Sequence, residues 1–260
     1  MKRGFKHLLN IDANAKTVKG QKHGFMTAVL YLAPFKLSGI NVCPFAEQAG
    51  CHKACLNTAG RGGIASKRFR TPVGLMPDNA CQRARIARTR FLHDDPDGFM
   101  KLLQREIELF VGRAGRKGLI PVVRLNGTSD ILWERMPVRQ AYPVEAFGAT
   151  IFDVFPDVQF YDYTKIWKRF ERPLPDNYHL SLSYSQASRK FADQCKRVHD
   201  ERGASLVVVV RDAETRDMHV ELGGVDGDAH DLRFLDPAGS MVYLKAKGAA
   251  RKDRTGFVID

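Results

Sequence analysis

Residues 205–210 have the sequence SLVVVV, a run so rich in β-branched side chains that it predicts a strand covered on both faces. Strands of this kind are typical of parallel sheets, where helices cover both faces. The preceding residues 186–202 predict a helix that ends at Gly203, because glycine readily adopts the left-handed conformation found at helix C-termini. A helix followed by such a strand indicates an α/β protein.

Strand and helix patterns alternate on the N-terminal side of this run. The predicted strands cover residues 24–34 (GFMTAVLYLAP), 119–125 (LIPVVRL), 158–163 (VQFYDY) and 178–184 (YHLSLSY). The predicted helices cover residues 78–93, capped by Asp78, a second stretch that begins at Asp95 and Pro96, and the short segment 164–170. Residues 137–147 and 151–155 are predicted to be partly helical. Three successive strand–helix units favour parallel strands over a β-sandwich.

The sequence predicts one domain. Residues 1–23 are basic and polar, and we expect a loosely held lead-in. Residues 24–260 contain no internal repeat and no low-complexity linker, so we expect a single α/β domain built as an incomplete or open parallel (β/α) barrel. Near the C-terminus, residues 218–222 and 241–244 are predicted to form short strands.

The chain is strongly basic, with 41 Lys and Arg residues against 29 Asp and Glu residues and a formal net charge of +12. Such an excess attracts polyanions, so nucleic acid or another anionic substrate is an expected partner. The alternative is a solubilising surface without a specific partner. The sequence lacks an apolar run long enough to span a bilayer and lacks a secretory signal, so we expect no membrane and a cytoplasmic location.

Residues 41–63, NVCPFAEQAGCHKACLNTAGRGG, gather three of the five cysteines. Cys43, Cys51 and Cys55 are separated by seven and by three residues, within a polar segment that can fold around one centre. Thiolates favour zinc and iron–sulfur clusters. A zinc site would take His52 or Cys81 as a fourth ligand, whereas a catalytic cluster would leave that position to a substrate. Ordinary reduced thiols are the third interpretation.

Ligand sites in parallel α/β folds form where the C-terminal ends of the strands meet. The predicted strands bring to this edge the cysteine loop together with Asn126, Thr128, Ser129, Asp130, Tyr163, Thr164, Lys165, Ser183 and Ser185. We assign candidate catalytic roles to Asp130 and Lys165. Candidate cofactor-binding roles go to Asn126, Thr128, Ser129, Tyr163 and Ser183. The carboxylate of Asp130 would act as a base or hold an amine or hydroxyl; equally, it would cap a helix.

Two C-terminal segments are rich in charge. The segment DGDAHD contributes Asp226, Asp228, His230 and Asp231, and the segment LKAKGAAR contributes Lys245, Lys247 and Arg251. The first would bind a divalent cation or form a Gly/Asp turn, and the turn is favoured because the remaining ligand spacing of a calcium loop is missing. The second would neutralise an anion or remain solvated.

Four segments within residues 24–251 stand out: MTAVLYLAP followed by LSGINVCPFAEQAGCHKACLNTAGRG, then PVVRLNGTSDILWE, FYDYTK and GDAHDLRFLDPAGSMVYLKAKGAAR. In these segments the chain resembles a family of tailed-bacteriophage proteins of the "gene product eighty-eight" type. The family's cysteine cluster is similar to an altered radical S-adenosylmethionine layout. The resemblance implies a partial (β/α)6 barrel with a [4Fe–4S] cluster on Cys43, Cys51 and Cys55. The cysteine spacing differs from the C-x3-C-x2-C of that superfamily, and no clear Gly-Gly-Glu motif is present.

The resemblance implies a phage-encoded iron–sulfur protein in the host cytoplasm, in which S-adenosylmethionine is the second cofactor. We expect such an enzyme to modify a nucleotide, a nucleic acid or another host target. The alternative is a zinc-stabilised, basic nucleic-acid-binding protein without catalysis, which would use residues 61–70 and 78–93 to neutralise phosphates. A host protein partner is a third possibility that leaves no sequence signal.

Overall fold

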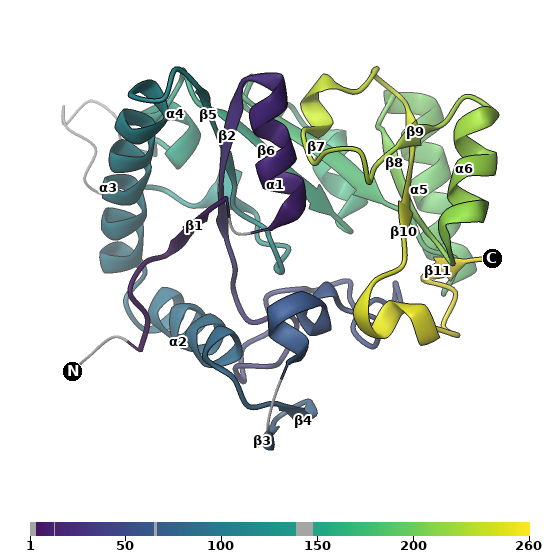
Figure 1. Cartoon of the computed structure of the whole chain (residues 1–260), viewed down its shortest axis with the longest axis horizontal. Helices are drawn as coiled ribbons and strands as arrows, with labels where there is room; N and C mark the ends of the chain where they lie inside the picture. The colour runs from purple at the N-terminus through teal and green to yellow at the C-terminus, as the bar shows by residue number, and fades with distance from the viewer. Residues whose placement is uncertain (1–3, 13, 65–66, 139–147) are drawn as a thin grey trace.

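The computed structural model describes residues 4–12, 14–64, 67–138 and 148–260, and in these ranges nine strands form one mostly parallel sheet (Figure 1). The strands of the sheet are β1 (Leu9–Ile11), β2 (Phe25–Leu30), β5 (Ile120–Arg124), β6 (Gln159–Thr164), β7 (Tyr178–Ser183), β8 (Leu206–Val210), β9 (Val225–Asp226), β10 (Met241–Lys245) and β11 (Val258–Ile259). A separate antiparallel hairpin joins β3 (Arg68–Thr71) and β4 (Gly74–Pro77).

The strands pair in the order β1-β2-β5-β6-β7-β8-β10-β9, and β11 pairs with β8. From β2 to β10 each neighbour in this path is parallel, whereas β1 is antiparallel to β2. These parallel strands follow one another in chain order. Because they run in the same direction, their C-terminal ends share one edge of the sheet. Among the described strands no pairing closes the sheet into a barrel.

Strand β8 is covered as its β-branched sequence predicts. It pairs with β10 along its whole length, and on the other side with β7 at its start and β11 at its end. Three of its side chains, Leu206, Val208 and Val210, pack on Phe191 and Val198, which belong to the helix before it. That helix ends at Gly203 with φ 66°, as predicted.

The helices are α1 (Ala15–Gly20), α2 (Ala80–Asp94), α3 (Pro96–Gly115), α4 (Ile151–Val154), α5 (Arg189–Arg202) and α6 (Ala213–Glu221). The 3-10 helices are η1 (Gln21–His23), η2 (Leu56–Thr58), η3 (Gly60–Gly63), η4 (Trp133–Arg135), η5 (Trp167–Glu171), η6 (Arg233–Leu235) and η7 (Gly248–Lys252). No described helix is both long and apolar enough to cross a membrane.

The larger hydrophobic core lies between the sheet and α3. Leu103, Ile107 and Phe110 of this helix pack against Leu30 and Val123 of the sheet, and all five are almost completely buried. Each such side chain contributes roughly 1.5–3 kcal/mol of hydrophobic stabilisation. The cluster that includes Val122, Tyr161 and Leu232, the residue before η6, is much smaller. Most hydrophobic stabilisation therefore comes from the α3 and α5 packing.

The N-terminal residues differ from the predicted loose lead-in. Leu8 and Leu9 are buried, and β1 pairs with β2. The Glu106 carboxylate of α3 accepts hydrogen bonds from the backbone N–H groups of Leu8 and Leu9 at 2.8–3.0 Å. Helix α1 is capped by Asn14. Pairing with β2 and the Glu106 contacts order a segment whose own sequence is polar.

The C-terminal prediction of a strand at residues 218–222 is wrong, because α6 occupies residues up to Glu221. Its N-cap is Asp212, whose side chain accepts the backbone N–H of Thr215 at 2.9 Å, a helix-start signal that outweighs the short apolar run. Helix α2 is capped by Asn79 rather than by Asp78. The helix expected over residues 137–147 lies largely outside the described residues.

Candidate functional site

The cysteine loop, residues 41–63, comes after β2 in the chain and runs along the edge where the parallel strands end (Figure 1). It is fastened first to the turn after β5. The backbone N–H of Asp130 donates to the carbonyl oxygen of Val42 at 2.8 Å, and the Cys43 thiol donates to the carbonyl of Thr128 at 3.8 Å. The loop therefore contacts the C-terminal end of the second parallel strand, as the strand order requires.

Further along, the same loop contacts the ends of later strands. The Ser185 hydroxyl, just after β7, donates to the carbonyl of Ala49 at 2.7 Å. The backbone N–H of Ala249 on η7 donates to the hydroxyl of Thr58 at 3.2 Å. These contacts hold a loop without regular strands or α-helices across most of the sheet edge.

The three loop cysteines are half-buried and interact electrostatically with one another. Burial raises the pKa of Cys43, Cys51 and Cys55, to about 11 for Cys55. The cation of Lys165 opposes this rise at Cys51, and that of Arg85 opposes it at Cys55. Without a bound cation the three sulfurs are thus neutral thiols at neutral pH.

The donor set has the chemistry of a metal site, because it offers three thiols from one loop beside two cations. Within the described ranges, however, no three His, Cys, Asp or Glu side chains are grouped as metal ligands. The Cys55 sulfur instead accepts the backbone N–H of Asn57 at 3.4 Å. Ligation would therefore require the loop to bring its sulfurs together.

The two predicted fourth ligands of a zinc site are placed differently. Nδ1 of His52 lies 3.0 Å from the carbonyl oxygen of Ala46, so the ring bonds to the loop's own backbone. Cys81 belongs to α2 and interacts electrostatically with Arg85 and Arg88. In the described residues neither His52 nor Cys81 is therefore grouped with the three loop cysteines as a fourth metal ligand.

Asp130 joins the ends of β5 and β6. Its carboxylate accepts the Thr164 hydroxyl and the backbone N–H of Lys165, both at 2.7 Å, and lies 3.6 Å from Arg169. Burial raises the pKa of Asp130, and the Arg169 charge opposes that rise. Asp130 does not cap a helix; it positions the start of the turn that follows β6.

Lys165 lies between the cysteine loop and the end of β7. Its ammonium donates to the carbonyl oxygens of Ser183 and Tyr184 at 2.9 and 3.1 Å, and it lies 4.4 Å from the ring centre of Phe257. Burial lowers the pKa of Lys165, whereas Cys51 raises it. Ser183 thus contributes its backbone carbonyl to this site.

Asn126 organises the NGTSD turn. Its side-chain oxygen accepts hydrogen bonds from Ser129, the backbone of Ile131 and the indole of Trp133 at 2.8–3.1 Å. Its amide donates to the Ile131 carbonyl. Thr128 likewise donates its hydroxyl to the backbone, at Leu32. In the structure these polar groups serve the turn, and a cofactor-binding role for Asn126, Thr128 and Ser129 stays a prediction.

Tyr163 lies apart from this group, on the other face of the sheet from Thr164. Its hydroxyl donates to Asp231 at 3.0 Å, and its ring centre lies 4.5 Å from the guanidinium of Arg124. Arg124 also pairs with Asp231 at 2.9 Å. Neighbouring strand residues point to opposite faces, so the structure does not bring the Tyr163 side chain together with Asp130, and a cofactor-binding role for Tyr163 stays a prediction.

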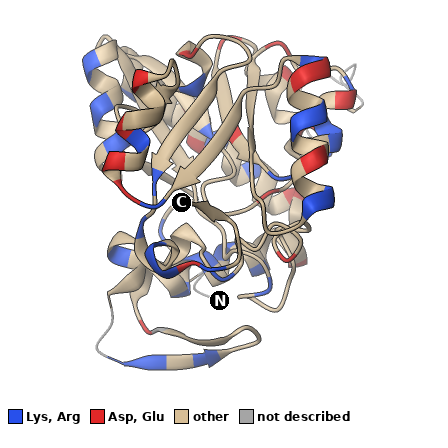
Figure 2. Ribbon diagram, turned by 90° about the vertical axis from the view of Figure 1, so that its right-hand side faces the viewer, with Lys and Arg blue, Asp and Glu red and all other residues tan. Residues whose placement is uncertain are grey.

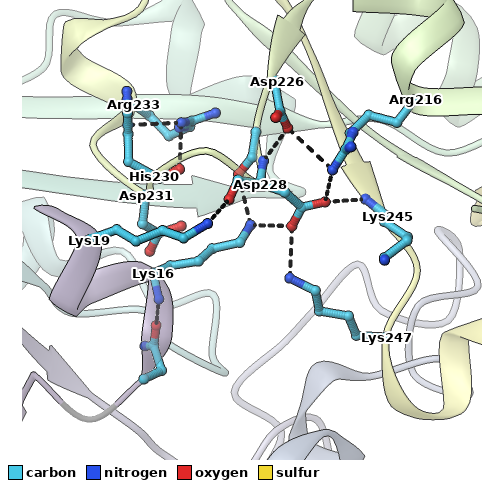
Figure 3. A network of polar contacts seen from close by, with 12 residues as sticks. Lys16, Lys19, Arg216, Asp226, Asp228, His230, Asp231, Arg233, Lys245 and Lys247 are labelled. Carbon is cyan, nitrogen blue, oxygen red and sulfur yellow. Dashed lines mark hydrogen bonds and ion pairs between the residues drawn. The ribbon is translucent and has the colours of Figure 1, made fainter. Parts of the chain in front are cut away.

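The acidic segment DGDAHD is held by cations, as Figure 3 shows. The Asp228 carboxylate pairs with Lys16 at 2.9 Å, Lys247 at 2.7 Å and Arg216 at 3.4 Å, and accepts the backbone N–H of Lys245. Although burial raises the pKa of Asp228, the charge of Lys16 and the hydrogen bonds from Lys247 and the Lys245 backbone lower it below its ordinary value. The segment forms an ionic link between α1, α6 and β10, a role that the sequence did not reveal.

Together these features define a class: an α/β protein whose parallel strands follow chain order and whose cysteine-bearing loop crosses their C-terminal edge. The family model described as Gene product 88 matches residues 7–260, so the chain belongs to this bacteriophage-associated family. No curated protein and no solved structure matches the chain.

Proposed function

We propose that this protein is an iron–sulfur protein in which Cys43, Cys51 and Cys55 hold a [4Fe–4S] cluster. The observation that supports this most directly is the position of all three cysteines in the loop after the first parallel strand. That loop crosses the sheet edge where ligand sites of parallel α/β folds form.

The strand order supports a radical-S-adenosylmethionine-like, incomplete (β/α) barrel. Doubly wound sheets reverse their strand order near the middle, whereas the strands of (β/α) barrels add successively to one edge. Here β2, β5, β6, β7, β8 and β10 follow chain order and are parallel. When bound, the cluster would supply one electron to the sulfonium of S-adenosylmethionine at its open iron.

The charges around the loop suit three thiolate ligands. Metal ligation removes the thiol protons, so Cys43, Cys51 and Cys55 would contribute three negative charges to a partly buried site. Lys165 beside Cys51 and Arg85 beside Cys55 offset part of that charge. In this proposal Asp130 positions the Lys165 segment through its hydrogen bond to the Lys165 backbone. Contact of Asp130 or Lys165 with a substrate would add the catalytic roles that we assigned to them.

The test is metal analysis of protein purified and reconstituted without oxygen. We expect about four irons and four sulfides per chain and a visible absorption that dithionite bleaches. Substitution of Cys43, Cys51 or Cys55 by serine should remove most of the iron. Cys195→Ser is the matched control, because Cys195 is buried in the α5 core.

Two results would contradict the proposal. Full iron content in all three single-serine variants would exclude these cysteines as ligands. One zinc per chain, with no iron after reconstitution, would favour the alternative of a zinc-stabilised nucleic-acid-binding protein.

A further inference from the structure

A groove of about 370 Å³ lies between the β3–β4 hairpin and helix α2. The residues that matter for its chemistry are Phe69 and Arg70 on the hairpin and Arg83, Ile86, Ala87 and Arg90 on α2. The hairpin projects beyond the rest of the fold below α2, and Figure 2 shows Lys and Arg positions on it (Figures 1 and 2). The groove is therefore formed by an arm and a helix that both present cations.

The four helix residues follow the spacing of one helix stripe. Ile86, Ala87 and Arg90 lie three, four and seven positions after Arg83, so the four residues lie on the same face of α2. Ile86 and Ala87 give this stripe an apolar centre, and the two arginines flank it. The stripe thus combines an apolar floor with a cation toward each end.

The groove has an excess of positive charge. No acidic residue lines it, and the structure gives no ion pair to Arg70 or Arg90 in the described part of the chain. Arg83 pairs with Asp78, yet its side chain remains 60% exposed. Two arginines without an ion pair in the described residues, Arg70 and Arg90, and a third that stays exposed beside its carboxylate partner favour a phosphate-bearing ligand.

Phe69 adds an aromatic surface to these cations. It lies between the exposed Arg68 and Arg70 in the strand, and it is itself half-buried along the groove. Bases stack on aromatic rings and on guanidinium planes with little sequence preference, but a base inside a duplex is not available for such stacking. Arginines beside a reachable aromatic ring therefore favour unpaired nucleotides over a duplex.

We propose that this groove binds single-stranded nucleic acid, with Arg70, Arg83 and Arg90 contacting phosphates and Phe69 stacking on a base. The inference goes beyond the proposed cluster, since it names a partner and depends on different residues.

Helix α2 connects the groove to the cysteine loop. On its other side, Gln82 and Arg85 donate hydrogen bonds to Asn57, and Arg85 interacts electrostatically with Cys55. An α-helix with its side chains is about 10–12 Å across, so a strand in the groove would lie about one helix diameter from the cysteine loop. Bound nucleic acid would thus be near the proposed cluster site.

The experiment measures binding of a fluorescein-labelled oligothymidylate by fluorescence anisotropy at several salt concentrations. The groove variant combines R70Q, R83Q and R90Q. The matched control combines R105Q, R113Q and R189Q, which remove the same charge from exposed positions on α3 and α5. On single strands each lost phosphate contact lowers the salt slope by about 0.7, so the groove variant should lose a slope of about 2 and the control much less.

A second variant, Phe69→Leu, separates stacking from charge. It should weaken binding roughly five- to hundredfold at constant salt and leave the salt slope unchanged, because a leucine keeps the apolar contact but not the aromatic ring. Circular dichroism melts check that each variant is folded. Oligouridylate in place of oligothymidylate distinguishes RNA from DNA, and either counts as single-stranded nucleic acid.

Three outcomes would overturn the inference: no binding by the wild type at low salt, equal losses in the groove and control variants, or duplex DNA bound as tightly as the single strand. The triple cysteine-to-serine variant keeps the two proposals apart. It should lose iron and retain oligothymidylate binding, whereas failure of the groove proposal would leave the iron content unchanged.

Discussion

Replacing Asp162 by asparagine should change how the stability of this protein depends on pH. Asp162 lies on β6 with no exposed surface. Its carboxylate accepts the backbone N–H of Asn126 at 2.7 Å and the hydroxyl of Tyr178 at 2.9 Å, and it lies 3.8 Å from Arg124. Burial raises its pKa to about 7 in spite of these partners. At neutral pH the fold therefore bears part of the cost of a buried carboxylate.

The direction in which the unfolding free energy changes with pH follows from proton linkage. A carboxyl group whose pKa is raised on folding contributes stability that is fully present below its unfolded pKa and is lost as the pH rises through the folded value. The pKa rises from 3.8 to about 7, a difference of roughly three units. Each pKa unit corresponds to about 1.36 kcal/mol, so ionisation of Asp162 lowers the unfolding free energy by about 4 kcal/mol as the pH rises from below 3.8 to above about 7. Between about pH 5 and pH 8 the loss is roughly 2–3 kcal/mol.

The assay is urea unfolding of the wild type and of Asp162→Asn at several pH values between about 5 and 8, followed by circular dichroism. Asparagine keeps an oxygen for the Asn126 N–H but does not titrate. The stability of the variant relative to the wild type should thus rise by roughly 2–3 kcal/mol over this range. Asp228→Asn is the control, because the lowered pKa of Asp228 puts its titration below this pH range. The difference in unfolding free energy between Asp228→Asn and the wild type should therefore not change with pH.

A difference between Asp162→Asn and the wild type that stays constant, or falls as the pH rises, would refute the reasoning. It would mean that Asn126, Tyr178 and Arg124 stabilise the carboxylate enough to cancel the cost of its burial.

Two further changes test the sheet edge. Gly127→Ala should lower the unfolding free energy by about 1–3 kcal/mol in urea melts, because a Cβ there would lie 2.7 Å from the Leu30 carbonyl oxygen. Gly115→Ala, which meets nothing within 4 Å, should not destabilise the protein. Arg169→Leu should cost about 3–5 kcal/mol, since it leaves the Glu134 carboxylate without its bidentate partner. The double variant with Glu134→Leu should lose much less than the sum of the single changes, and strict additivity would contradict the pairing.

Much of the fold could be predicted from local sequence signals. The SLVVVV run, the Gly203 helix end and the Asp95–Pro96 helix start all correspond to elements of the structure. The missed strands β1, β9 and β11 have only two or three residues. They form because they pair with longer neighbouring strands, and their own sequences do not predict them. The β3–β4 hairpin was missed because its glycine and arginine content is also typical of a solvated loop.

The site was predictable to the level of the sheet edge but not to individual side chains. The rule that ligand sites form at the C-terminal ends of parallel strands predicts the cysteine loop beside Asp130 and Lys165. The structure brings these residues together. Tyr163 and Thr164 are neighbours in sequence and point to opposite faces, because strand side chains alternate. The apolar pattern of FYDYT does not reveal which face receives which residue, since both faces of this strand are buried.

The positions of the cations matter more for function than their excess. Lys16, Arg216 and Lys247 are bound by the acidic segment around Asp228, and Arg124 and Arg169 are buried in ion pairs. These five cations hold the fold together, so they add little to the attraction of an anionic partner. Among the described residues no acidic residue lines the groove of Arg70, Arg83 and Arg90, and of these three arginines Arg83 has an ion pair, with Asp78. A net charge of +12 is compatible with many anions, whereas exposed arginines beside an aromatic ring and one helix away from the cysteine loop favour single-stranded nucleic acid.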